Sequence, residues 1–212
     1  MMEQQARGMD MNVLMQRIRR LFTLDTTVFD DVRTDVSSTV PAFIVVVVAT
    51  LLFGLGGWFW WLLQDYPDLS GIPGTGEMFF KSVIIGGIVS LVLWGVWLGL
   101  TYIMLTQVFR ARADIQELLR VMGFAAAPLA LGILLFIPQL EYAVGLTTLA
   151  LFFGANLIAV QTATDAPAGR VLASVGAGFF VWALILAFFV GDDSIYAPGF
   201  FIFDIGVEAF RY

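Results

Sequence analysis

The chain has 212 residues, of which 59% are hydrophobic and 13% are charged. An ordinary soluble domain carries about a quarter charged residues, and one core of this size could not hide 20 Phe and 6 Trp without leaving large apolar patches in water. The composition therefore excludes an ordinary soluble globular domain and makes the lipid bilayer the first partner of the chain.

Charge and missing residue types exclude further classes of function. The net charge is −6, which is the opposite of the basic footprint of a nucleic-acid-binding protein. The chain has no His and no Cys, so it lacks an imidazole base, a thiolate and the commonest ligands of zinc, haem and iron–sulfur centres. No phosphate-binding glycine loop or nucleophile elbow is present either. We expect no enzymatic activity, no cofactor, no metal and no nucleic acid partner.

The first predicted element is an amphipathic helix from Met11 to Phe22. Its apolar residues follow helical spacing, and Arg17, Arg19 and Arg20 lie near its end. The helix is therefore expected to lie at the inner membrane interface, where these arginines would contact anionic headgroups, each contributing about 1 kcal/mol. The alternative is that its apolar stripe packs against the protein itself or a partner.

The next stretch, from Val28 to Val36, also has helical spacing and is predicted to lead directly into the first membrane span. A spanning helix needs about 20 mostly apolar residues, and five such runs follow. They are Val40–Leu63, Val83–Leu105, Val121–Ile137, Val144–Val160 and Val171–Val190. Each run is apolar on all sides, unlike the alternating strands of a membrane barrel.

The predicted fold is thus an all-α integral membrane protein with five transmembrane helices. Residues 1–39 form the N-terminal cytoplasmic amphipathic segment, residues 40–190 the transmembrane domain, and residues 191–212 an extracytoplasmic tail. Basic residues set the orientation, because they stay on the cytoplasmic side. Nine basic residues lie on the side of the membrane where the N-terminus is predicted, and only two, Lys81 and Arg211, lie on the opposite side. The N-terminus is therefore expected inside and the C-terminus outside.

Local signals add detail between the spans. Residues 64–80 contain Pro and Gly and are predicted to form a loop. The third helix is predicted to begin in the cytoplasm near Asp114, which with Glu117 resembles a capping box, and to bend at Pro128. Residues 138–143 allow only a tight turn, so the third and fourth spans should be antiparallel neighbours. The apolar residues 200–203 of the tail are expected to fold back onto the outer surface or to contact a partner.

Polar and small residues inside the spans are the candidate functional positions. Asn156, with Gln161 near the inner end of the same span, could bind a substrate or ion, although an interhelical hydrogen bond is the favoured interpretation. Small residues allow close backbone approach between helices, either within one chain or between chains. The most regular of them are Gly86, Ser90, Gly95 and Gly99 in the second span and Gly123 in the third.

The run from Phe109 to Leu131, FRARADIQELLRVMGFAAAPLAL, resembles the central signature of the Yip1-domain family. The N-terminal part resembles bacterial members, with Leu24, Asp25, Phe29, Val32 and Asp35 in matching places. The resemblance implies five spans with a cytoplasmic N-terminus, and no catalytic residue. It implies bending and close packing for Gly123 and Pro128. Eukaryotic relatives are secretory-pathway proteins that bind Rab-type GTPases and help to shape or traffic membranes.

Our hypothesis is a non-enzymatic protein of a bacterial cytoplasmic membrane that acts through helix contacts. It would serve as a scaffold, a membrane organiser or an accessory subunit, in a homo-oligomer or with other membrane-protein subunits. The alternative is a transporter or channel for a neutral or hydrophobic solute, with the bend at Pro128 and Asn156 near its path.

Overall fold

The computed structural model describes residues 11–23, 25–63, 74–190, 199–200 and 202. In these residues the regular structure is helical, apart from one isolated β-bridge between Ala113 and Thr164. Five helical segments are long and apolar enough to cross a membrane, which confirms the predicted number of spans. They are Val36–Leu63, Thr75–Val108, Ile115–Phe136, Glu141–Thr162 and Ala168–Ala187.

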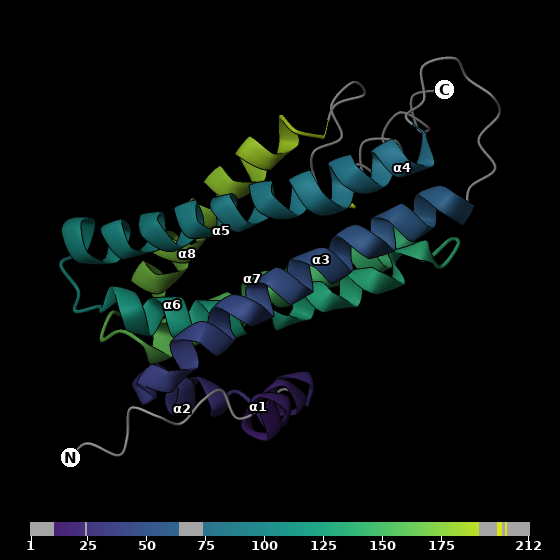
Figure 1. Ribbon diagram of the computed structural model, residues 1–212. Helices are drawn as coiled ribbons and strands as arrows, with labels where there is room; N and C mark the ends of the chain where they lie inside the picture. Colours follow the sequence, from purple (N-terminus) through teal and green to yellow (C-terminus); the bar gives the residue numbers. More distant parts are fainter. Residues whose placement is uncertain (1–10, 24, 64–73, 191–198, 201, 203–212) are drawn as a thin grey trace.

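The spans form two groups that run side by side (Figure 1). One group holds α5 (Gly86–Ile103) and α8 (Ala168–Ala187), which pack against each other. The other holds α3 (Thr39–Leu63), α6 (Ile115–Phe124) with its continuation η5 (Ala127–Phe136), and α7 (Glu141–Thr162). Among the described elements α3 and η5 make the most extensive contact, and α7 also packs against η5.

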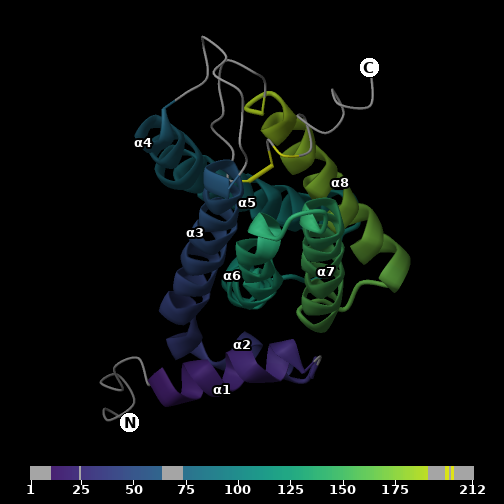
Figure 2. The same ribbon diagram turned by 90° about the vertical axis from the view of Figure 1, so that its right-hand side faces the viewer.

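Two short helices precede the first span. Figure 2 shows α1 (Met11–Phe22) and α2 (Val28–Thr34) lying across one end of the bundle rather than along it. We call this the arginine end, because α1, α2, α6, the loop before α6 and the first turn of α8 bring their arginines there. We call the other end the far end.

The connection from α2 to the first span differs from the prediction of a direct continuation. Asp35 is extended, with φ −84° and ψ 99°, and its side chain accepts a hydrogen bond from the backbone N–H of Ser37. This capping bond starts a new helix, η2 (Val36–Ser38), that runs into α3. A single capping aspartate therefore separates α2 from the first span.

The second span is longer than predicted. Residues 64–73 lie outside the described residues, but 75–80 are helical, so the loop prediction is wrong there. The helix begins as α4 (Thr75–Met78) and continues through the π-helix η3 (Phe79–Ile85) into α5. A 2.7 Å ion pair between Glu77 and Lys81 supports its first turns. A second π-helix, η4 (Met104–Val108), ends the span.

The third span begins where the sequence predicts, at Asp114, whereas the bend expected at Pro128 stays a prediction. The Asp114 side chain caps α6 by accepting hydrogen bonds from the backbone N–H groups of Gln116, at 2.8 Å, and Glu117, at 3.0 Å. The α-helix ends at Phe124, and Pro128 lies in the first turn of the 3-10 helix η5, a position where a residue without an N–H is well tolerated. The helix type thus changes from α to 3-10 within the span, and the following turn returns the chain antiparallel as α7.

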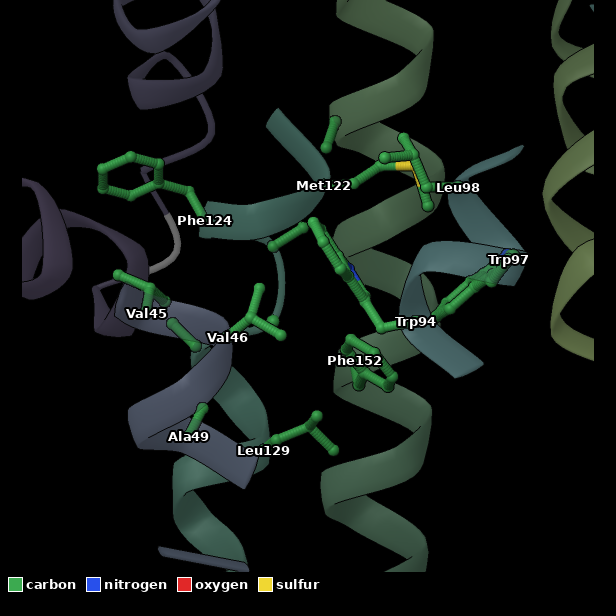
Figure 3. Packing of buried hydrophobic residues seen from close by; sticks show 14 of the residues in the cluster. Val45, Val46, Ala49, Trp94, Trp97, Leu98, Met122, Phe124, Leu129 and Phe152 are labelled. Carbon is green, nitrogen blue, oxygen red and sulfur yellow. The ribbon is translucent and has the colours of Figure 1, made fainter. Parts of the chain in front are cut away.

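Aliphatic and aromatic side chains together fill the centre of the bundle (Figure 3). The fully buried Trp97 joins α5 to α8, because its Nε1 donates a 3.0 Å hydrogen bond to the carbonyl oxygen of Val175. Its ring meets that of Phe152 edge-on at 5.0 Å. Phe200 stacks on Phe53 with 4.5 Å between ring centroids, so this described part of the tail folds back onto the bundle.

Candidate interaction site at the arginine end

A pair of arginines ties the N-terminal segment to the bundle. Arg120 in α6 is only 4% exposed and donates from Nε and Nη2 to the carbonyl oxygen of Arg33, at 3.0 and 2.6 Å. Arg33, at the end of α2, donates from Nη1 to the carbonyl oxygen of Thr162. Its Nε lies 3.6 Å from a carboxylate oxygen of Glu117. These contacts fasten α2 to the start of α6 and the end of α7.

The two loops at this end are joined to each other. The hydroxyl of Thr164 donates to the carbonyl oxygen of Arg112 at 2.9 Å, and the backbone N–H of Arg112 donates to the Asp165 carboxylate at 2.9 Å. Arg170 at the start of α8 donates to the carbonyl oxygen of Phe109 at 3.3 Å, and its guanidinium lies 6.0 Å from the Phe109 ring centre. The loop before α6 is thus fixed against the loop before α8.

An open depression of about 630 Å³ lies between these elements. It is lined by Arg33, Thr106, Ala111, Arg112, Ala113, Asp114, Glu117, Ala163, Thr164 and Asp165. The lining therefore carries three carboxylates and two guanidiniums. Among the described residues no group of three or more acidic side chains converges as metal ligands do. The depression can therefore offer a ligand both positively charged hydrogen-bond donors, the guanidiniums, and negatively charged acceptors, the carboxylates.

The three arginines predicted to contact lipid headgroups have different surroundings. Arg17 donates to the Asp35 carboxylate at 2.8 Å and to the Ser38 hydroxyl at 2.6 Å. Arg20 donates to the carboxylates of Asp25, at 2.7 Å, and Asp31, at 2.5 Å. Arg19 is exposed. Two of the three charges are therefore balanced by carboxylates of the chain, and the headgroup contact stays a prediction.

The same contacts change two carboxyl pKa values. Hydrogen bonds from Thr27 and Arg20 lower the pKa of Asp25 from 3.8 to about 2. Burial acts to raise the pKa of Asp35, but hydrogen bonds from Ser37, Arg17 and Ser38 outweigh it and hold that pKa below its ordinary value. Both carboxyl groups therefore stay ionised at neutral pH and keep holding α1.

The predicted packing residues separate into buried and open positions. Gly86 and Ser90 are buried in α5. Gly123 lies against α3, where an added Cβ would come within 2.7 Å of the Ala42 Cβ. A Cβ added at Gly95 or Gly99 would meet no atom within 4 Å. These two glycines therefore pack against nothing in the described chain, and their role in self-association stays a prediction.

The two predicted polar residues are both bonded locally. Asn156 is fully buried, and its Nδ2 donates to the carbonyl oxygen of Phe152 at 2.8 Å, one turn earlier in α7. Its Oδ1 has no hydrogen-bond partner among the described residues. The hydrogen bond expected between helices is thus made within one helix. Gln161 donates from Nε2 to the carbonyl oxygen of Ala166 at 3.0 Å, which braces the loop after α7.

The model of the Yip1 domain family matches residues 20–191. That range holds all five spans and the two arginines, Arg33 and Arg120, that fasten α2 to the bundle. The chain belongs to the Yip1 family. No curated protein and no solved structure matches the chain.

The Yip1 signature run supplies much of the arginine end. Its Asp114 caps α6 and its Glu117 pairs with Arg33. Its Arg120 holds α2 through the carbonyl oxygen of Arg33. Sequence reasoning missed the partners of this run, Arg33 and Thr164, because they lie far from it along the chain. One available signal was Arg120 itself, since a guanidinium at the start of an apolar span needs acceptors from another segment.

Proposed function

We propose that this Yip1-family chain is a non-enzymatic membrane organiser or accessory subunit that acts through contacts between its helices and those of other subunits. The observation that carries the proposal is the open glycine face of α5, at Gly95 and Gly99. Exposed apolar side chains surround it, among them Val92, which is 60% exposed. In lipid, helices associate by close backbone approach, which small residues permit. A second apolar helix would fit this face closely.

The arginine end supports a cytoplasmic N-terminus within this proposal, because basic flanks stay inside. α1 lies across that end and exposes Met11, Met15 and Phe22, apolar side chains suited to the membrane interface. Arg19 is exposed and free to meet anionic headgroups. In this orientation the charged depression faces the cytoplasm, where it would receive a polar segment of the same partner.

The test compares two kinds of open glycine. Gly95→Leu with Gly99→Leu fills the face of α5, whereas Gly176→Leu fills another open position, on α8, that has Leu172 and Phe180 one turn away on either side. We expect the double variant to lose its companions, or its self-association, in mild-detergent pull-downs from the native membrane, and Gly176→Leu to keep them. A wild-type chain that is monomeric in native-lipid discs and has no companion contradicts the proposal.

A second candidate function is a carrier or channel for a neutral solute. The observation that favours it is the Oδ1 atom of Asn156, fully buried and without a hydrogen-bond partner among the described residues. A neutral solute with a hydrogen-bond donor could use this acceptor. Solute flux into proteoliposomes that disappears in Asn156→Leu supports the carrier, and flux that is equal in protein-free liposomes rules it out.

A further inference from the structure

A small pocket lies in the middle of the bundle, away from the arginine end. Its lining comes from all five spans and from the tail: Val46, Thr50, Phe53, Ser90, Trp94, Leu129, Phe152, Trp182 and Phe200. It is partly open, and its free volume is about 10 Å³, which is close to the room that one water molecule needs. No charged side chain lines it.

Two hydrogen-bond donors in this lining have no partner among the described residues. Ser90 Oγ and Trp94 Nε1 are both unpaired, and the two residues are only 6% and 5% exposed. They are four residues apart on α5 and therefore share one face of the helix. Figure 3 shows the Trp94 side chain reaching from α5 across toward α3 and α7, whereas Trp97 points the other way.

Other buried atoms of α5 and α7 also lack a partner among the described residues, namely Thr101 Oγ1, Thr148 Oγ1 and Asn156 Oδ1. Their side chains do not line the pocket. Ser90 and Trp94 differ from them because the space beside them is free. Burial of a donor without an acceptor is costly, so free space beside two such donors indicates a bound group that supplies the acceptor.

We propose that this pocket binds a slender, neutral and mainly apolar molecule through one hydrogen-bond-accepting oxygen, such as a ketone or ester carbonyl. An indole N–H can only donate, so the ligand must accept. A charged ligand would lie without a counter-ion, which excludes it. The free space has room for the oxygen alone, so an apolar chain must displace lining side chains, and the aromatic rings of Phe53, Phe152 and Trp182 would then contact it. This site goes beyond the organiser role and does not depend on association with a partner.

The test observes the indole N–H groups of the full chain directly. The chain is labelled with 15N-tryptophan, placed in nanodiscs of ether-linked phospholipid, which has no ester carbonyl, and titrated with 2-decanone. Decane is the matched control without an acceptor. Trp97 and Trp58 are internal references, because their Nε1 atoms already donate to the carbonyl oxygens of Val175, at 3.0 Å, and Thr75, at 3.2 Å. Trp94→Phe identifies the Trp94 signal.

We expect 2-decanone to move the Trp94 indole proton downfield to a plateau, while decane and both reference signals show no such change. Ser90→Ala should weaken the apparent affinity about five- to tenfold, since one of two hydrogen bonds is lost. Phe200→Ala should tighten binding, because it widens the pocket. Ser90→Ala keeps the test decisive if Trp94→Phe does not fold.

Discs of ester-linked phospholipid distinguish two sources of the carbonyl. A Trp94 signal that is already shifted in these discs, relative to ether-linked discs, identifies a lipid ester as the resident ligand. A shift that needs added ketone identifies a free molecule. The proposal is overturned if saturating ketone leaves the Trp94 signal in place or if decane moves it equally. It is also overturned if the Trp94 indole N–H contacts only a water molecule when ketone is present.

Discussion

Two glycine-bearing helix faces have opposite surroundings. Where α3 meets η5, an added Cβ at Gly56 would collide with the carbonyl oxygen of Gly132, and one at Gly132 would collide with the Phe53 ring. On the outward face of α5, Gly95 and Gly99 have no atom within 4 Å of the same position. We call these the α3–η5 seam and the α5 face. Glycine thus allows close contact between two helices at the α3–η5 seam, whereas on the α5 face it leaves a surface that no other described segment covers.

The comparison teaches that a glycine in an apolar helix is not by itself a sign of close packing. The seam has backbone against backbone, with the Phe53 ring close to it, whereas an added Cβ on the α5 face would meet no other segment of the described chain. Whether a glycine is closely packed depends on which segment of a neighbouring helix faces it. Substitutions that add one methyl group therefore separate the two faces sharply.

The largest effect is expected for Gly56→Ala in the seam. The added methyl group meets backbone atoms of η5, which cannot move as a side chain can, so α3 and η5 must separate. We expect a loss of about 3 kcal/mol in the free energy of unfolding. Reversible unfolding in mixed micelles measures it, with Gly95→Ala as the matched control. Equal stability of the two variants would contradict the difference between the faces.

A smaller loss is expected for Gly178→Ala, at the contact between α8 and Trp97. The methyl group would collide with the indole ring, which can shift only by weakening its 3.0 Å hydrogen bond to Val175. We expect a loss of about 1 to 2 kcal/mol. The same micelle unfolding measures it, and the indole N–H signal of Trp97 should move upfield. An unchanged signal with unchanged stability would show that this contact is loose.

Much of the fold could be predicted from the sequence, because the dominant signal in lipid is local. Runs of apolar residues place all five spans, and the capping side chain of Asp114 places the start of α6. The errors arose where a local signal had two outcomes. Asp35 lies in a helical pattern but caps the next helix instead, and the turn residues of 64–80 concealed a helix that begins at Thr75.

The candidate sites were less predictable, because their partners are distant in the chain. Arg120 holds the carbonyl oxygen of Arg33, 87 residues away. The sequence marks Ser90 as a small packing residue, but only the fold shows that Trp94 and Ser90 border a common free space. Likewise, the presence of glycine in an apolar helix could not show which glycines pack closely, as in the seam, and which stay open, as on the α5 face. Each of these distinctions depends on the facing helix.

The α5 face should tolerate the change that breaks the seam. In Gly95→Ala with Gly99→Ala, the methyl groups enter open space and reduce the freedom of the unfolded chain. We expect the free energy of unfolding of the monomer to rise by about 0.5 to 1 kcal/mol per site. Unfolding in mixed micelles at high detergent concentration, which keeps the chain monomeric, tests this. A loss of stability would mean that the face is packed within the chain.

The smallest expected effect is a pH dependence that α1 should show and that the seam and the α5 face should lack. Neither face has a titratable side chain at its glycines, whereas Arg20 holds α1 to the Asp25 carboxylate. The pKa of Asp25 is lowered to about 2 in the folded chain, from 3.8. A lowered pKa means that this contact contributes fully above pH 3.8 and is lost as the pH falls toward 2.

Amide hydrogen exchange of α1 in micelles should therefore stay constant from neutral pH down to about pH 4, after correction for intrinsic exchange, and its protection should decrease between about pH 4 and 2. Asp25→Asn should show the reduced protection already at neutral pH. Amides of α3 at the seam serve as the control and should keep their protection throughout, because no carboxylate holds that interface. A decrease centred near pH 6, or one shared equally by α3, would show that the contact between Arg20 and Asp25 does not help to hold α1.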